Sequence, residues 1–263
     1  MKIKKRNWLI VLIMVGLIVG LVMTSASSVF AGNNKAKVMP PYAYPFGMSY
    51  GDWSAEWWTW QLKLPATEHP AFSLDGANCA AGQYGKVWFL TGAFTTEVPE
   101  NEFNTIVREL CAVPTGKAIF FPIINIECST IEEAPFLLIE EGPDSNVDTC
   151  AASFVDGTNA VVSDLSIEID GEQLENPEHY QAQSPVFSFE FEDPSDNILG
   201  VDCSAEDCND ARSVSDGFWI MLPPLSRGEH IVRFTGSFRD PNNGDLFFGL
   251  DVTYVITVVG GKK

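Results

Sequence analysis

Alternation of apolar and polar side chains near the C-terminus restricts the fold of this chain more than any other feature. Between positions 246 and 258, one face of the chain collects six apolar or aromatic residues at every second position: Phe248, Leu250, Val252, Tyr254, Ile256 and Val258. A period of two is typical of a β-strand that buries one face.

Shorter strand patterns occur along the rest of the chain, separated by glycine and proline. They lie at residues 86–91, 104–113, 118–126, 165–169, 187–191, 217–222 and 229–237. Segment 118–126 is apolar at nearly every position, which favours burial on both faces, and Pro122 within it indicates a bulge or an edge position. We therefore predict a mainly β fold, an antiparallel β-sandwich of the jelly-roll or immunoglobulin-like kind.

Residues 49–64 are predicted to form a tryptophan-rich helix. Trp53, Trp57, Trp60 and Leu64 are spaced i, i+4, i+7 and i+11, so they share one face of a helix. Ser49 or Asp52 can cap its start, and Pro65 ends it. The periodicity of residues 145–154 predicts one short additional helix.

The first 31 residues have the pattern of a secretory signal peptide. A basic start precedes an apolar stretch at 8–23, and a small-residue segment ends at Ala31. We expect cleavage there, then an extended, proline-rich lead-in at 32–48 and a single sandwich domain at 49–260. No later segment is apolar enough to span a membrane, so a secreted, periplasmic or cell-surface location is expected.

The charge balance is strongly acidic. The chain has 16 basic and 35 acidic residues, and four of the basic ones lie in the signal segment, which leaves 12 against 35, a net charge of −23. Such a surface repels phosphate, so no nucleic-acid partner is expected.

The six cysteines predict three disulfide bonds. An even number of cysteines in an exported chain is typical of disulfides, and the absence of a C-x2-C pair disfavours structural zinc. Six cysteines allow many pairings, and sequence spacing is only a guide. The spacing favours Cys79–Cys111, Cys128–Cys150 and Cys203–Cys208.

Three stretches resemble an uncharacterised family of secreted microbial proteins. They are YGDWSAEWWTW at 50–60, VWFLTG at 87–92 and CAVPTGKAIFFPIIN at 111–125, and the tail at 217–258 is similar to the last strands of that family. The resemblance implies export and the fold. No activity is known for the family, so it assigns no site residues.

Two groups of residues are candidates for binding. Trp58 lies off the main apolar stripe of the predicted helix, so it either forms an exposed stacking surface with Glu56 and Asp52 or fills a second side of the core. Acidic residues around the predicted short disulfide offer oxygen ligands for calcium, and solvated turns are the alternative. The candidate calcium ligands are Asp202, Glu206, Asp207 and Asp210.

No catalytic residue is predicted. Ser49 lies in a G-x-S-x-G motif, but no strand precedes it and no H-G-G-G motif exists, so its better interpretation is a helix cap. Each histidine follows a glutamate, yet neighbouring strand residues point to opposite faces, so no pair is assigned. The leading hypothesis is an exported, non-catalytic binding or envelope-associated protein that binds a glycan or a cell-surface protein. The alternative is a secreted hydrolase of carbohydrates or esters that uses carboxylates or Ser49.

Overall fold

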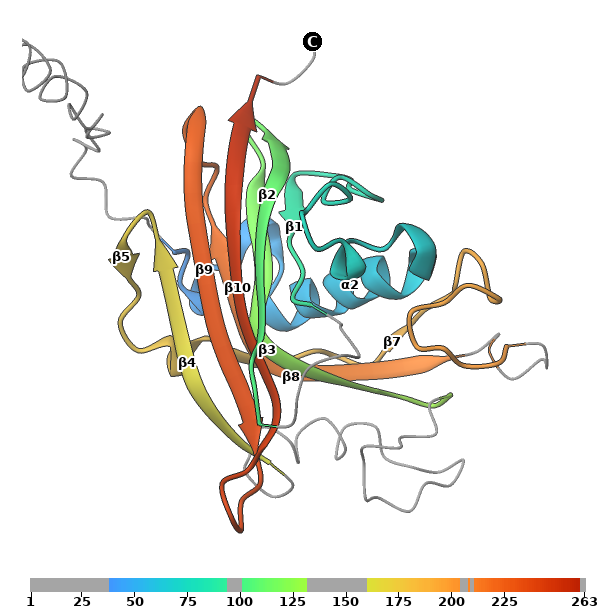
Figure 1. Ribbon diagram of the computed structural model, residues 1–263. Helices are drawn as coiled ribbons and strands as arrows, with labels where there is room; N and C mark the ends of the chain where they lie inside the picture. Colours follow the sequence, from blue (N-terminus) through green and yellow to red (C-terminus); the bar gives the residue numbers. More distant parts are fainter. Residues whose placement is uncertain (1–37, 94–100, 132–159, 204–207, 209–210, 261–263) are drawn as a thin grey trace, which may run out of the picture. The chain divides into compact units, whose positions relative to one another are not determined.

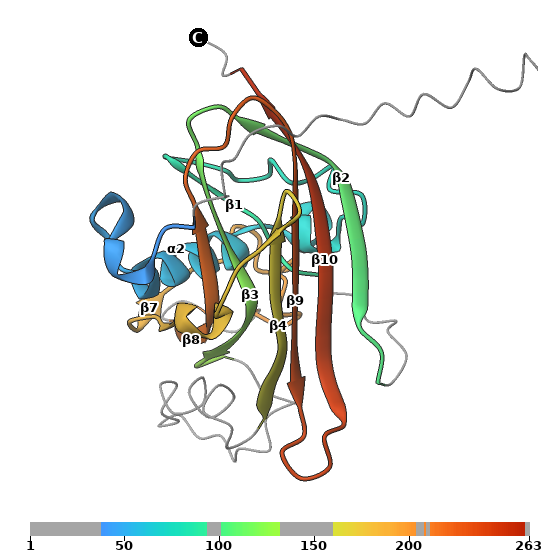
Figure 2. The same ribbon diagram turned by 90° about the vertical axis from the view of Figure 1, so that its left-hand side faces the viewer.

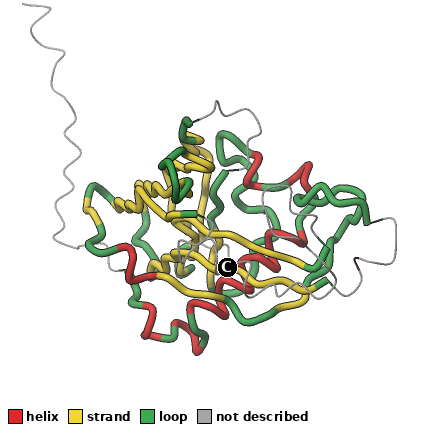
Figure 3. Tube along the Cα trace, turned by 90° about the horizontal axis from the view of Figure 1, so that it is seen from below, coloured by secondary structure: helices red, strands yellow, loops and turns green. Residues whose placement is uncertain are grey.

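The computed structural model describes residues 38–93, 101–131, 160–203, 208 and 211–260, which belong to one compact unit. Its helix and strands, in chain order, are α2 (Tyr50–Lys63), β1 (Val87–Phe89), β2 (Asn104–Pro114), β3 (Ala118–Ser129), β4 (Val161–Ile169), β5 (Glu172–Gln173), β6 (Gln181–Gln183), β7 (Phe187–Ser188), β8 (Arg212–Leu222), β9 (Gly228–Arg239) and β10 (Leu246–Val259). Short 3₁₀ turns occupy Pro41–Ala43, Pro45–Gly47, Ala66–Glu68, Pro70–Phe72 and Pro177–Tyr180. Strands dominate the described chain (Figure 3), which confirms the mainly β prediction.

Several predicted elements differ from the observed ones. The predicted helix at 145–154 lies outside the described residues. The predicted strand at 187–191 is only the two-residue β7. The lead-in contains two 3₁₀ turns where an extended chain was predicted, because Pro41 and Pro45 each supply the fixed backbone angle that suits the first position of a turn.

The strands form two sheets. We call one the helix-side sheet, with the order β1-β3-β8-β6 and β7 also paired with β8; the outer sheet has the order β2-β10-β9-β4-β5. Figures 1 and 2 show the two sheets as separate layers, with α2 beyond the helix-side sheet. Most pairings are antiparallel, but β1–β3 and β2–β10 are parallel, unlike the purely antiparallel sandwich predicted. The chain crosses to the outer sheet at β2 and returns at β3, which lets β1 and β3 run in the same direction.

Strand β3 lies between two cores. Ile119, Phe121 and Ile123 pack with residues of the outer sheet, whereas Ala118 and Phe120 pack with residues of α2. Both faces of β3 are therefore buried, as predicted. The pairing of β3 with β8 shifts register between Pro122 and Ile124, which confirms the bulge that the proline indicated.

Helix α2 begins with a capping box and packs on the helix-side sheet through its tryptophans. Ser49 is the N-cap and Asp52 is its reciprocal partner. Trp57 and Trp60 are almost fully buried, and their Nε1 atoms donate hydrogen bonds to the carbonyl oxygens of Leu90 and Ala81 at 2.8 and 3.0 Å. The predicted apolar stripe is thus a core contact. No described helix has the length and apolar character needed to cross a membrane.

Two of the predicted disulfides, Cys79–Cys111 and Cys203–Cys208, are present. Cys128 is also disulfide-bonded, and its predicted partner Cys150 lies outside the described residues. Since disulfides form and persist in oxidising surroundings, these bonds indicate that the protein folds in an oxidising compartment.

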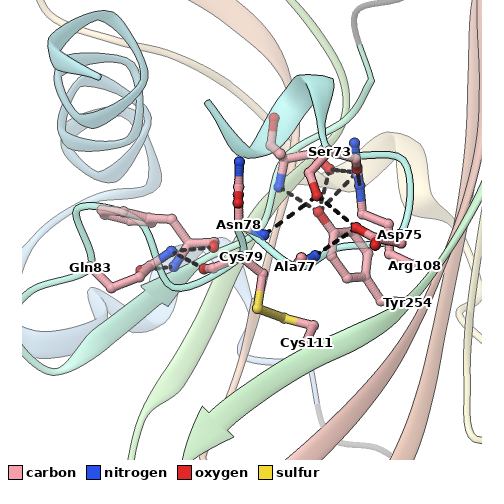
Figure 4. The surroundings of a disulfide bond; sticks show 11 residues. Ser73, Asp75, Ala77, Asn78, Cys79, Gln83, Arg108, Cys111 and Tyr254 are labelled. Carbon is pink, nitrogen blue, oxygen red and sulfur yellow. Dashed lines mark hydrogen bonds between the residues drawn. A yellow bond between two sulfur atoms is a disulfide. The ribbon is translucent and has the colours of Figure 1, made fainter. Parts of the chain in front are cut away.

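A buried arginine joins the segment at 65–86 to both β2 and β10 (Figure 4). Arg108 is fully buried, and its guanidinium donates hydrogen bonds to four backbone carbonyls and to the hydroxyl of Tyr254: the carbonyls are those of Ala71, Ser73, Thr91 and Gly92. The Cys79–Cys111 disulfide ties the same segment to β2 close by. Together these contacts fix the segment that carries Tyr84.

Candidate functional site

The predicted binding residues Asp52 and Glu56 lie on the solvent side of α2, but Trp58 does not. Trp58 is only 6% exposed and packs edge-to-face against Trp57, with ring centroids 5.0 Å apart. It fills the core between α2 and the helix-side sheet, which was the second of the two predicted roles. Trp58 therefore cannot be the exposed stacking surface, because the packing of α2 on the sheet covers both sides of the helix stripe.

Aromatic rings nevertheless lie near Glu56: Tyr84 bonds to it, and Trp53 precedes it by about one helical turn. We define the Glu56 surface as Phe46, Trp53, Glu56 and Tyr84. The hydroxyl of Tyr84 donates a hydrogen bond to Oε2 of Glu56 at 2.9 Å, and Phe46 stands edge-on to Trp53 at 6.0 Å. Phe46 and Tyr84 are 48% and 50% exposed, and Trp53 is half-buried. Burial, followed by the hydrogen bond and the charge of Glu56, raises the pKa of Tyr84, so this hydroxyl remains a proton donor at physiological pH.

The rings of the Glu56 surface are held rigidly. Nε1 of Trp53 donates to the carbonyl oxygen of Pro45 at 2.9 Å, which fixes the turn before α2. Next to Tyr84, the side chain of Gln83 exchanges two hydrogen bonds with the backbone of Phe89, at 2.9 and 2.8 Å. Ordered surroundings of this kind reduce the conformational entropy that a ligand would otherwise remove on binding.

The turn beside Trp53 has an unusual backbone. Tyr44 and Phe46 have φ angles of 46° and 57°, in the left-handed region that bulky residues rarely adopt. Tyr42, Tyr44 and Phe46 are all exposed. Backbone strain and exposed aromatic rings both concentrate at functional surfaces, which favours a role for this turn in recognition.

A groove adjoins the C-terminal half of α2. We define the Lys63 groove as the space between Thr59 and Lys63 of α2, residues 188–192, and Arg212 at the start of β8; its volume is about 730 Å³. The backbone N–H of Glu192 donates to the carbonyl oxygen of Lys63 at 3.1 Å, and Ser188 pairs with Arg212 across β7 and β8. The groove walls are therefore held by backbone contacts.

Ser49 serves the helix rather than a catalytic site. Its Oγ accepts a hydrogen bond from the Asp52 N–H at 3.0 Å and donates one to Oδ2 of Asp52 at 2.7 Å. The backbone N–H of Ser49 also donates to Oδ2 of Asp52 at 2.9 Å. The two bonds that the carboxylate accepts from Ser49, the side-chain one first, lower the pKa of Asp52. The element before Ser49 is the 3₁₀ turn Pro45–Gly47, so the strand that a nucleophile elbow requires does not precede it.

A Ser–His–Asp cluster that the sequence did not reveal lies elsewhere. Nδ1 of His230 lies 2.7 Å from Oδ2 of Asp170, and Nε2 lies 3.2 Å from Oγ of Ser226. Nε2 also lies 3.0 Å from the carbonyl oxygen of Ser226, which can only accept a hydrogen bond. A hydrogen bond to that carbonyl needs a proton on Nε2, which leaves Nε2 no lone pair to accept the proton of the Ser226 hydroxyl. The cluster joins the turn after β4 to the loop before β9.

The acidic residues give few indications of a metal site. Among the described residues, no cluster of three or more histidine, cysteine, aspartate or glutamate side chains is placed to hold a metal ion. Of the predicted calcium ligands, Asp202 is described, whereas Glu206, Asp207 and Asp210 lie outside the described residues. Calcium binding at that loop stays a prediction.

Comparisons with known proteins give little further information. No protein-family model and no curated protein matches the sequence. Two solved structures align with it. PbICP-C, solved in complex with falcipain-2, is 11% identical over 66% of this chain and 100% of that one, with a TM-score of 0.23. The cysteine protease inhibitor EhICP2 from Entamoeba histolytica is 13% identical over 65% of this chain and 94% of that one, with a TM-score of 0.21. Similarity at this level supports no conclusion about ligands.

Proposed function

We propose that this protein is an exported, non-catalytic binding protein whose Glu56 surface takes a carbohydrate ligand. The observation that carries the proposal is a group of partly exposed rings beside a carboxylate: Tyr84 bonds to Glu56, and Trp53, which Phe46 contacts, lies about one helical turn before it. Phe46, Trp53 and Tyr84 offer apolar faces, and Glu56 offers oxygen acceptors at the same place.

This combination suits a sugar better than a purely apolar ligand. A sugar ring has apolar C–H faces that can cover an aromatic ring and hydroxyl groups that can donate to a carboxylate. Oε2 of Glu56 is already engaged by Tyr84, which orients the carboxylate. The charge of that carboxylate strengthens any hydrogen bond it accepts from a hydroxyl.

Export is supported by the predicted signal peptide and by the disulfides. A non-catalytic role is supported by the hydrogen bonding of the two serine candidates. Ser49 is engaged in a helix cap, and Nε2 of His230 faces the carbonyl oxygen of Ser226, which can only accept a hydrogen bond.

The test is affinity electrophoresis of the mature protein in gels that contain hydroxyethylcellulose, xylan or laminarin. We expect at least one of these neutral polysaccharides to retard the protein. Tyr84→Ala and Phe46→Ala should each weaken retardation by about tenfold or more, the size expected for an aromatic anchor.

Two matched variants serve as controls, with folding checked by circular dichroism. Phe72 is 41% exposed outside the Glu56 surface, so Phe72→Ala should leave retardation unchanged. Glu56→Gln should weaken it, whereas Glu68→Gln, which changes an exposed glutamate outside the Glu56 surface, should not. Equal retardation of all variants, or none in any polysaccharide, would refute the proposal. Fluorophosphonate labelling that Ser226→Ala or Ser49→Ala abolishes would favour the hydrolase instead.

A further inference from the structure

The Lys63 groove contains two cationic side chains for which the described part of the chain supplies no ionic partner, in a protein where cations are scarce. In the outer sheet, by contrast, two arginines pair with aspartates: Arg233 bonds to Asp251 at 2.7 Å and Arg239 to Asp164 at 2.9 Å. Among the described residues, neither Lys63 nor Arg212 takes part in an ion pair.

We infer that the Lys63 groove is a second binding site, for a carboxylate-bearing, hydroxyl-rich ligand of the uronic acid class. This goes beyond the proposed function, because it names a separate site on other residues and a charged ligand. Its volume of about 730 Å³ falls within the range of small-molecule sites.

The residues of the groove match each part of such a ligand. The guanidinium of Arg212 can hold a carboxylate with two parallel hydrogen bonds, and the ammonium of Lys63 adds a second positive charge. Ser188 offers a hydroxyl for hydrogen bonding, and that of Thr59, which donates to the carbonyl oxygen of Ala55 at 2.8 Å, can still accept one. The half-buried ring of Phe191 offers an apolar surface for a sugar face.

The two glutamates of the groove restrict the class of anion. Glu190 and Glu192 line it together with the cations. They repel densely charged ligands such as polyphosphates or polyacidic peptides, but they accept hydrogen bonds from neutral hydroxyls. A ligand with one carboxylate per unit and several hydroxyls is compatible with all four charged side chains.

The groove and the Glu56 surface share one stripe of α2. Asp52, Glu56, Thr59 and Lys63 are spaced by four, three and four residues, so they lie along the solvent side of the helix. Seven residues separate Glu56 from Lys63, which corresponds to roughly 10 Å along the axis. An oligosaccharide that carries uronic acid could therefore reach from the groove toward the Glu56 surface.

Isothermal titration calorimetry with trigalacturonate as the probe tests the inference. We expect binding that weakens as salt is raised, because screening reduces the attraction between opposite charges. Lys63→Gln and Arg212→Gln should each weaken binding by about tenfold or more. The matched variants Lys86→Gln and Arg227→Gln, which change exposed cations outside the groove, should leave it unchanged.

Three results would overturn the inference: no binding of trigalacturonate, binding unaffected by Lys63→Gln and Arg212→Gln, or equally tight binding of a triglutamate peptide. Tyr84→Ala distinguishes the proposed groove site from the neutral-carbohydrate site of the proposed function. Loss of neutral-polysaccharide binding in this variant, with trigalacturonate binding retained, supports two sites. If the protein bound trigalacturonate but none of the neutral polysaccharides, the proposed function would be refuted and the inference about the Lys63 groove would stand.

Discussion

Acidification should destabilise this protein through a single buried histidine. His69 is 1% exposed; its Nδ1 accepts a hydrogen bond from the Ala71 N–H at 3.1 Å, and its Nε2 lies 3.1 Å from the carbonyl oxygen of Gln61. A neutral ring protonated on Nε2 satisfies both contacts, whereas a proton on Nδ1 would break the bond to Ala71. Burial lowers the pKa of His69 from 6.5 to about 4; the bond to Gln61 opposes this shift, and the charge of Arg108 adds to it.

The sign and size of the effect follow from linkage. Because the folded-state pKa is depressed, the unfolded chain binds this proton first as the pH falls. The contribution of His69 to the free energy of unfolding is fully present above pH 6.5. It is lost progressively from pH 6.5 down to about 4 and changes no further below that. The whole difference corresponds to about 3 kcal/mol, of which about 2 kcal/mol falls between pH 7 and pH 5.

Urea unfolding followed by circular dichroism, with disulfides intact, provides the measurement. The free energy of unfolding of the wild type and of His69→Gln is compared at pH 7 and pH 5. His179 and His230 are present in both proteins, so their contributions cancel in the difference. We expect the wild type to lose about 2 kcal/mol more than the variant over this interval. An identical pH dependence in the two proteins would show that His69 is not kept neutral by burial.

Four further variants, two of them double cysteine replacements, test the packing. Gly51→Ala should lower the free energy of unfolding in urea by about 1–3 kcal/mol, although alanine favours helices. The reason is that its Cβ would lie 2.3 Å from the carbonyl oxygen of Gln183. Unchanged stability would contradict the close approach of α2 to β6. Replacing both cysteines of Cys79–Cys111 by alanine should cost about 4 kcal/mol, against about 2 kcal/mol for Cys203–Cys208, since the loops span 32 and 5 residues; equal thermal midpoints would argue against the loop-entropy account. Arg108→Met should lower the free energy of unfolding by about 3 kcal/mol or more, because it leaves several buried carbonyl oxygens without a hydrogen-bond donor. A variant that is as stable as the wild type and unfolds cooperatively would show that these hydrogen bonds are dispensable.

The candidate surface could be predicted only in part. Asp52 and Glu56 were predicted from the helix, and both lie on its solvent side. Tyr84 was missed, because it is 28 residues from Glu56 and its segment shows no periodicity that would place it there. Lys63 and Arg212 were missed for the same reason, since they meet only through the packing of α2 near β8.

The Ser226–His230–Asp170 cluster could not be assigned from sequence either. The glutamate before each histidine gave no pair, because neighbours in a strand point to opposite faces. The partner of His230 is 60 residues away, in the turn after β4. The pairing of β4 with β9 brings the two together.

Local rules in the sequence determined the β class, the helix with its cap and the bulge at Pro122, because periodicity, capping and turn chemistry act over a few residues. The spacing of the cysteines favoured the two observed disulfides, but only folding brings Cys79 to Cys111, 32 residues away. The tertiary structure alone decided which residues of β2 are buried. The pairing of β2 with β10 shifts register between Tyr254 and Ile256, so Glu109 and Leu110 both face outward while Arg108 and Cys111 face inward. No alternation of hydrophobicity could place an arginine in the core; it lies there because five oxygens from the segment at 65–93 and β10 converge on it once the chain has folded.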